Sequence, residues 1–151
     1  MSSKSSTPES LHHSDEIKKA IAAAAEIREM SATDVSPLTI FDKIIAGDIP
    51  CNKVYEDDIV LAFHDVNPVA PVHILIIPKV RDGLTQISKS CTQQHQATLG
   101  HAMMVASQIG KQYCQDNGFR IVINDGEHGG QSVYHLHVHV IGGRQMQWPP
   151  G

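Results

Sequence analysis

The chain has 151 residues, which is the size of a single domain. Its 12 basic and 16 acidic residues give a net charge of −4, so it lacks the surplus positive charge that non-specific nucleic-acid binding requires. No run of about 18 apolar residues is present to span a membrane. The cysteines, at positions 51, 91 and 114, are widely spaced, which argues against a disulfide scaffold and favours a reducing compartment such as the cytoplasm or nucleus.

The first 38 residues are expected to form an N-terminal extension. Residues 1–14 are rich in serine and poor in large apolar side chains, so they are predicted to be disordered. Residues 15–30 have an alanine-rich helical pattern with a narrow apolar stripe, and Ser14 suits its N-cap. The polar linker 31–38 then separates this helix from a domain that we expect over residues 39–151.

Helical and strand patterns follow one another through this domain. Helices lie between groups of strands, and strict βαβ alternation is missing, so the predicted fold class is α+β with a mainly antiparallel sheet. The helix-like segments are Thr39–Gly47, stopped by its glycine, and residues 92–117. The segments with strand patterns are Cys51–Glu56, Ile59–His64, His73–Ile77, Phe119–Asn124 and Val133–Ile141.

The long helix has one apolar stripe and two neighbouring methionines. The residues that follow the 3.6-residue period are Leu99, Ala102, Met103, Ala106, Ile109 and Tyr113. Because Met103 and Met104 are adjacent, one of them must leave the stripe. Either that methionine meets a partner subunit, or the helix has a broad buried face.

The last predicted strand contains three histidines at alternate positions. His135, His137 and His139 are expected to share one face, while the apolar residues between them pack into the core on the other. Imidazole can act as a metal ligand, as an acid or base, or as a nucleophile. Two of these histidines together with His73 could hold zinc, although the outer pair lie about 13 Å apart along a strand. The alternative without a function is a row of surface histidines.

A glycine-rich loop directly precedes the histidines. Gly126, Gly129 and Gly130 allow backbone N–H groups to approach an anion closely, and Ser132 adds a hydroxyl donor. Imidazole N–H groups can hold phosphate oxygens as well. The combination therefore favours phosphate binding more strongly than the loop alone would.

The sequence from His135 to Val140, HLHVHV, resembles the signature of the histidine triad family, His-φ-His-φ-His-φ with φ apolar. The stretch NDGEHGGQSVYHLHVHVIGGRQMQWPPG over residues 124–151 resembles the Hint branch in particular. So do TIFDKIIAGDIP (39–50), LAFHDVNPVAPVH (61–73) and the IIPK that ends at Lys79. The resemblance covers residues 39–151.

The resemblance implies a homodimeric α+β domain with a five-stranded sheet, a long central helix and a short helix. It implies binding of purine nucleoside monophosphates and hydrolysis of the P–N bond of nucleoside phosphoramidates, with acyl- and aminoacyl-adenylates as further substrates. The resemblance also implies that the activity requires no cofactor or metal, and that neither nucleic acid nor a membrane is a partner. By this resemblance His137 is the nucleophile and His135, His139, His73 and Ser132 are its catalytic partners. The implied nucleotide contacts are Phe63, His64, Asp65, Val66, Asn124, Gly130, Gln131, Ser132, His137, His139 and, reaching the partner subunit's site, Trp148.

Three other functions remain open at this point. The chain could be a zinc-binding regulatory module without catalysis, or a scaffold that uses its nucleotide pocket as a sensor. It could also be a nucleotidyl transferase or a dinucleoside polyphosphate hydrolase, as in other branches of the superfamily. Cys51 and His128 have no firm counterpart in the family, although both lie near site segments in the sequence.

Overall fold

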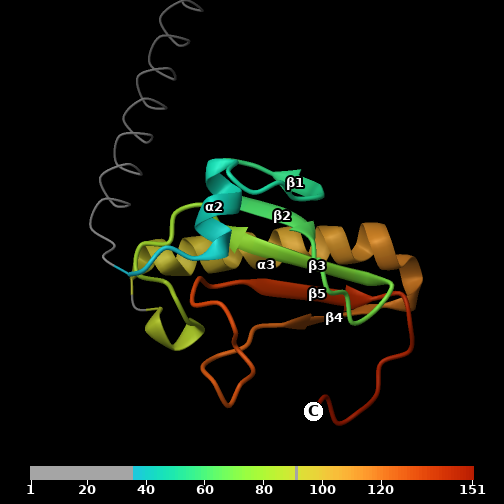
Figure 1. The fold of residues 1–151 in the computed structure, drawn as a ribbon. Helices are drawn as coiled ribbons and strands as arrows, with labels where there is room; N and C mark the ends of the chain where they lie inside the picture. The colour runs from blue at the N-terminus through green and yellow to red at the C-terminus, as the bar shows by residue number, and fades with distance from the viewer. Residues whose placement is uncertain (1–35, 91) are drawn as a thin grey trace, which may run out of the picture. The chain divides into compact units, whose positions relative to one another are not determined.

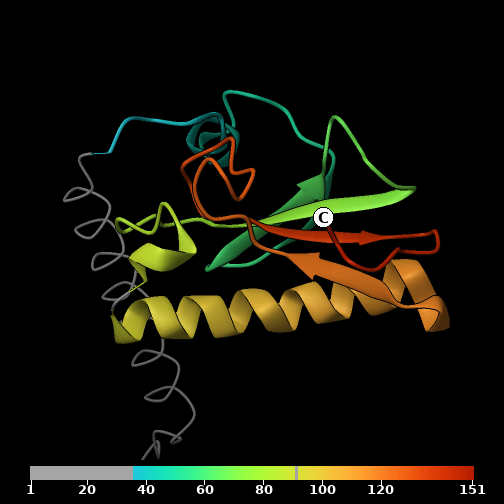
Figure 2. The same ribbon diagram turned by 90° about the horizontal axis from the view of Figure 1, so that it is seen from below.

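The chain forms a five-stranded antiparallel sheet with helices on both faces (Figures 1 and 2). The computed structural model describes residues 36–90 and 92–151. The disorder predicted for residues 1–14 and the helix predicted over 15–30 lie outside the described residues. Among those residues no helix is long and apolar enough to cross a membrane.

The sheet order is β1-β2-β3-β5-β4, and every neighbouring pair is antiparallel. This confirms the predicted α+β class and its long helix; the homodimer stays a prediction. The strands are β1 (Lys53–Glu56), β2 (Val60–His64), β3 (Val72–Pro78), β4 (Phe119–Val122) and β5 (Val138–Gly142). The helices are α2 (Ile40–Ala46) and α3 (Gln93–Cys114), with short 3-10 turns at Ile87–Lys89 and Gln115–Asn117.

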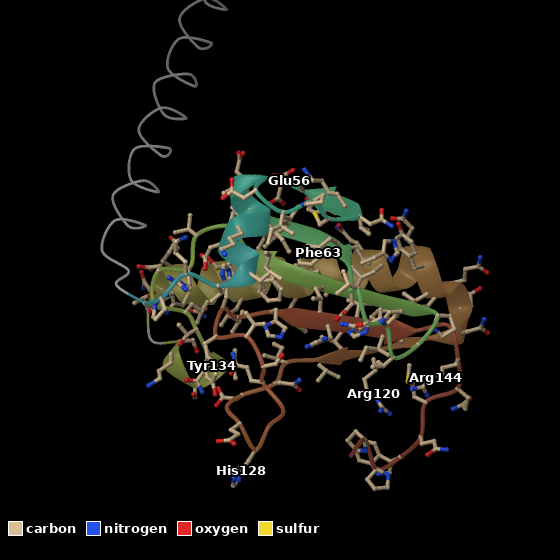
Figure 3. All side chains as sticks on the ribbon, viewed as in Figure 1. Glu56, Phe63, Arg120, His128, Tyr134 and Arg144 are labelled. Atoms are coloured by element: carbon tan, nitrogen blue, oxygen red, sulfur yellow. The ribbon has the colours of Figure 1, made fainter. Side chains whose placement is uncertain are left out.

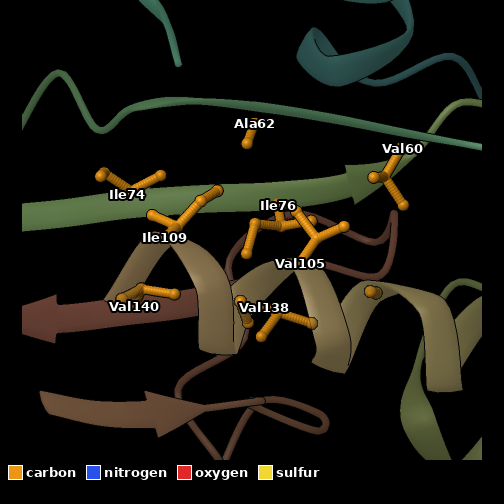
Figure 4. Packing of buried hydrophobic residues seen from close by; sticks show 10 residues of the cluster. Val60, Ala62, Ile74, Ile76, Val105, Ile109, Val138 and Val140 are labelled. Atoms are coloured by element: carbon orange, nitrogen blue, oxygen red, sulfur yellow. The ribbon is translucent and has the colours of Figure 1, made fainter. Parts of the chain in front are cut away.

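Each face of the sheet buries its own apolar cluster. On the α3 face, β3 and β5 alternate their side chains so that Ile74, Ile76, Val138 and Val140 pack against the helix (Figure 4). On the opposite face the helix α2 inserts Phe41 among residues of β2 and β3. The second cluster comprises Phe41, Leu61, Phe63, Leu75 and Ile77. The central strand β3 is therefore covered on both sides, as its continuous apolar run predicts.

The short helix α2 begins and ends where the sequence predicts. Thr39 caps its N-terminus in a capping box with Asp42, and each of these two side chains is bonded to the other's backbone N–H. Gly47 ends the helix with φ 83°, a left-handed conformation that suits glycine.

The apolar stripe of α3 was predicted correctly only in part. Ala102, Ala106 and Ile109 are buried, but Met103 and Tyr113 are 40% and 38% exposed, so their assignment to the core is wrong. Val105, which is 2% exposed, packs into the core instead. Met104 is exposed as well, so a broad buried face is wrong for both methionines. A partner subunit on this surface remains a prediction.

The last strand starts five residues later than predicted, at Val138 rather than Val133. Pairing with β3 stops at Ile76–Val138, close to the end of β3 at Pro78. Proline has no N–H to continue a ladder. Beyond this point the Leu136 N–H donates to the Leu84 carbonyl. His135 and His137 consequently lie outside the ladder, in the segment that leads into β5.

Candidate active site

Four histidines gather on the face of the sheet that carries α2. His73 comes from β3 and His139 from β5, with ring centroids 5.2 Å apart, and the His137 ring lies 4.9 Å from that of His139. The ring of Phe41 in α2 packs edge-to-face against the rings of His135 and His137, with centroids 5.9 and 5.2 Å apart. The predicted separation of histidines from the buried valines of β5 is therefore present, although only His139 belongs to the strand.

Hydrogen-bond partners assign the protons of His73 and His139. The Val69 N–H donates to His73 Nδ1 at 3.2 Å, so the proton of His73 is on Nε2. That Nε2–H donates to His139 Nδ1 at 2.9 Å. His139 consequently carries its proton on Nε2, a buried donor that has no hydrogen-bond partner among the described residues.

Carbonyl partners assign the other two histidines in the same way. His137 Nδ1 is 2.8 Å from the carbonyl oxygen of His135, which can only accept, so Nδ1 holds the proton and Nε2 holds a lone pair. His135 Nε2 donates to the Pro78 carbonyl at 2.8 Å. The basic nitrogen of His137 is therefore Nε2, which lies on the side of the ring away from the His135 carbonyl.

Burial favours the neutral form of the imidazoles of His137 and His139. Burial lowers the pKa of His137, and the hydrogen bond to His135 and the charge of Asp65 offset only part of that effect. The pKa of His139 falls to about 4, first through burial and then through the charges of His137 and His73. Neutral imidazole is the nucleophilic form, so the row is suited to attack at neutral pH.

The end of β2 places a carboxylate beside the row. Asp65 Oδ2 is 3.5 Å from His73 Nε2, and its Oδ1 accepts a hydrogen bond from the Asn67 backbone. The adjacent Val66 is 89% exposed. A ligand held at the histidines would find an acceptor at Asp65 and an exposed apolar side chain at Val66.

Phe63 and His64, the preceding residues of β2, are placed differently. Phe63 is buried against Phe41, in the cluster beneath the histidines. The His64 ring packs against Tyr113 of α3, on the opposite face of the sheet. A contact between His64 and a nucleotide on the histidine face is therefore left to its backbone.

The glycine-rich loop is fixed by a buried glutamine. Gln131 is 6% exposed, and its side-chain oxygen accepts from the Gly126 N–H at 3.0 Å. Its amide nitrogen donates to the carbonyls of Thr85 and Val133, at 2.7 and 3.0 Å. Because all of these polar atoms are engaged, the side chain of Gln131 shapes the loop, and a contact to phosphate is left to its backbone.

The remaining predicted residues lie at or near the surface. Asn124 donates to the Gly130 carbonyl at 3.3 Å across the base of the loop, and Ser132 is exposed at its end. His128 lies at the tip of the loop, far from Phe63 (Figure 3). Trp148 is 83% exposed, so its predicted contact with a partner subunit stays a prediction.

Sequence reasoning missed two residues of α2 that approach the row. Phe41 packs on two histidine rings, and Asp42 Oδ1 is 3.5 Å from His135 Nδ1. The sequence signals for this segment are a helix start and an apolar position, and neither indicates contact with residues nearly a hundred positions away.

Three groups of the site are close enough to be considered as metal ligands. The ligand atoms of Asp65, His73 and His139 lie within 4.8 Å of one another. However, His73 Nε2 carries the proton as long as the Val69 N–H donates to its Nδ1. A zinc ligand must offer a lone pair there. This hydrogen-bond pattern does not fit a metal held by that set.

Comparison with known proteins agrees with this architecture. The HIT domain family model matches residues 46–146. The chain is 55% identical over 132 residues to adenylylsulfatase HINT1 of Arabidopsis thaliana, covering 87% of this chain and 89% of that protein. It is 59% identical over 118 residues to a 14 kDa zinc-binding protein of Zea mays, covering 78% and 91%. A HIT family hydrolase from Legionella pneumophila superposes with a TM-score of 0.70 at 40% identity, over 76% of this chain and all of the other. The chain therefore belongs to the HIT family, and within it to the Hint branch.

Proposed function

We propose that the chain is a hydrolase that cleaves the P–N bond of purine nucleoside phosphoramidates through a covalent nucleotidyl-His137 intermediate. The observation that carries the proposal is the state of His137, a neutral imidazole whose Nδ1–H is held by the His135 carbonyl while Nε2 keeps its lone pair. Acyl- and aminoacyl-adenylates, which present the same phosphorus to the same nucleophile, are further proposed substrates.

The reaction takes two displacements at phosphorus. His137 Nε2 attacks the α-phosphorus, the bond from phosphorus to the amine breaks, and the amine leaves with a proton supplied by Ser132 or a histidine. Water then attacks the same phosphorus, the bond to His137 breaks, and AMP is released. The buried Nε2–H of His139 lacks a hydrogen-bond partner among the described residues, and a phosphoryl oxygen bound at His137 is an acceptor suited to it.

The groups around the row supply nucleotide binding in this proposal. Asp65 accepts hydrogen bonds from ribose hydroxyls, and the backbone of the Gly130–Ser132 segment faces the phosphate. Val66 contributes apolar contact. Trp148 reaches the site of the other subunit in a homodimer. We place this activity in the cytoplasm or nucleus.

A second candidate substrate is adenylyl sulfate. It is supported by the Arabidopsis relative, which is named an adenylylsulfatase and is 55% identical to this chain over 132 residues. The same attack by His137 would release sulfate instead of an amine. Sulfate is a weak base and leaves without a proton, so Ser132→Ala should slow phosphoramidate cleavage while sparing adenylyl sulfate cleavage.

We propose that neither reaction needs a metal. The maize relative is named a zinc-binding protein, and Asp65, His73 and His139 form the cluster that such a site would use. The Val69 and His73 hydrogen bonds favour a proton at the nitrogen that zinc would need. Turnover that survives extensive chelation supports this view, and turnover restored only by added zinc would contradict it.

The deciding experiment offers purified full-length protein a panel of adenosine phosphoramidate, aminoacyl-adenylate and adenylyl sulfate. The nucleotidylated protein is trapped by rapid denaturation in base, because the bond from phosphorus to imidazole is labile in acid, and its modified residue is mapped by mass spectrometry. We expect AMP attached to His137, with turnover reduced by about three orders of magnitude or more in His137→Ala while AMP still binds. The control His128→Ala removes an exposed histidine of the loop tip and should leave turnover unchanged. Full activity in His137→Ala would refute the covalent mechanism.

A further inference from the structure

The carboxylate of Asp42 lies behind the histidine row, at the end opposite Asp65. His135 is fully buried, with an exposed fraction of 0%. Its Nε2–H donates to the Pro78 carbonyl, and its Nδ1 has no hydrogen-bond partner among the described residues. The charged group that this nitrogen faces is Asp42, whose Oδ1 is 3.5 Å away.

The orientation of Asp42 is fixed by its other oxygen. Oδ2 accepts hydrogen bonds from the Thr39 backbone and hydroxyl, at 2.6 and 2.8 Å. The Arg81 guanidinium contacts the same oxygen at 3.4 Å and also donates to the backbone carbonyls of Ser36 and Pro37. Because these donors all hold Oδ2, Oδ1 is left facing His135.

The charges around His135 are unequal. Burial alone would raise the pKa of Asp42, but the two Thr39 hydrogen bonds, with the charges of His135 and Arg81, bring it below its ordinary value, so the carboxylate is ionised at neutral pH. Burial lowers the pKa of His135; the Pro78 hydrogen bond and Asp42 oppose that fall, whereas Arg81 and His137 add to it. At neutral pH an anion therefore faces a neutral imidazole across a gap that holds no proton.

The row of imidazoles thus has a carboxylate at each end. Asp65 stands 3.5 Å from His73, and Asp42 stands 3.5 Å from His135. His137 lies between them and donates its Nδ1–H to the backbone of His135. Attack on phosphorus turns the neutral His137 ring into a cation, and that cation is stabilised by fixed negative charge nearby in a water-poor site.

We propose that Asp42 is a positioning residue for the reaction at His137, acting through His135. Its ionised carboxylate lies beside the buried His135 ring, whose carbonyl orients the nucleophile, and its negative charge favours the cationic form of His137 that exists after attack. The proposal rests on the proposed function, because it concerns the rate of the covalent step. It adds α2, and through Arg81 the backbone at Ser36 and Pro37, to the machinery of the site.

The variant Asp42→Asn tests the charge while keeping the shape. The asparagine oxygen can still accept from Thr39, and its amide can donate to the lone pair of His135 Nδ1, so the fold should be retained. We expect the rate of His137 nucleotidylation, measured by rapid quench in base under single-turnover conditions, to fall about tenfold or more. The dissociation constant for AMP should stay within about twofold of wild type, because Asp42 does not contact the nucleotide in this scheme.

Two further variants separate positioning from general stability. Asp48→Asn removes the same charge from an exposed site just after α2 and should leave the nucleotidylation rate unchanged. Asp42→Glu keeps an acidic residue that can complete the capping box, but its longer arm shifts the carboxylate. It should fold as well as wild type and recover part of the rate that Asp42→Asn loses. If Asp42→Asn fails to fold, the nucleotidylation rates of Asp42→Glu and Asp42→Gln are compared instead, because these two variants also differ only in the charge of the side chain.

A histidine titration provides a readout that does not depend on activity. In ¹⁵N NMR the pKa of His135 should lie lower in Asp42→Asn than in wild type, because the anion that favours its protonated form is gone, and Asp48→Asn should not move it. An active wild type with equal nucleotidylation rates in Asp42→Asn and Asp48→Asn overturns the proposal and leaves the proposed function standing. A wild type that forms no nucleotidylated protein with any substrate of the panel overturns the proposed function, and this inference with it.

Discussion

Replacing Gln131 by methionine tests how the segment that carries the nucleophile is held in place. Methionine has nearly the same length and volume, so the change removes polar contacts and little packing. Three hydrogen bonds are lost, from the Gly126 N–H and to the carbonyls of Thr85 and Val133. Each is worth about 1 kcal/mol net, and the buried groups left without partners add to the loss. We therefore expect the free energy of unfolding to fall by about 2–4 kcal/mol.

Urea unfolding followed by circular dichroism measures this difference, with Gln96→Met as the matched control. Gln96 is exposed on α3, so the same chemical change there should alter stability by no more than about 0.5 kcal/mol. Because Ser132 directly follows Gln131, the turnover of Gln131→Met should fall as well. Equal stability of the two variants would refute the view that the glutamine side chain fixes the loop.

The described contacts lead to four more expected outcomes. Asp65→Ala should weaken AMP binding about tenfold or more in calorimetric titration, since a carboxylate that accepts from ribose hydroxyls is lost; an unchanged dissociation constant contradicts that role. Because the pKa of His137 is lowered, turnover should decline only below the ordinary histidine value of 6.5, and a decline that sets in above pH 7 contradicts a neutral nucleophile. The pKa of His139 is about 4 in the folded chain against 6.5 when unfolded, so the unfolded chain binds more protons between these values. The free energy of unfolding should therefore decrease as the pH is lowered from 6.5 to about 4. Gly110→Ala should destabilise α3 by about 1–3 kcal/mol because the new Cβ overlaps the Phe119 ring, whereas Gly100→Ala, with open space around it, should stabilise by about 0.5–1 kcal/mol; equal effects of the two changes on the urea midpoint refute this contrast.

Local patterns allowed much of this fold to be predicted. The short helical segment from Thr39, its stop at Gly47 and the alternation in β2 depend on neighbours within a few residues, and all three are present. The alternation of histidines with apolar residues also depends only on local spacing. These features could be recognised before any pairing of distant segments was known.

The features that sequence reasoning missed depend on contacts between distant segments. The alternation in β2 shows that His64 and Asp65 lie on different faces, but both faces are buried, so it does not show which one meets the histidines. The exposure of Met103 depends on which stripe of α3 meets the sheet. Asp42 reaches His135 only because α2 packs on β2 and β3. In each case the deciding partner is remote in the sequence.

The late start of β5 is also what gives the site its chemistry. In a continuous ladder the backbone N–H and carbonyl groups around the histidines would form hydrogen bonds with those of the neighbouring strand. Here the ladder ends near Pro78, and the Pro78 carbonyl accepts from the side chain of His135. The His135 carbonyl, which lies outside the strand, accepts from His137 Nδ1 and leaves Nε2 as the basic nitrogen. A strand over the full length of the motif would place the imidazoles on one face, but it would remove the acceptors that hold the proton of His137 away from the attacking nitrogen.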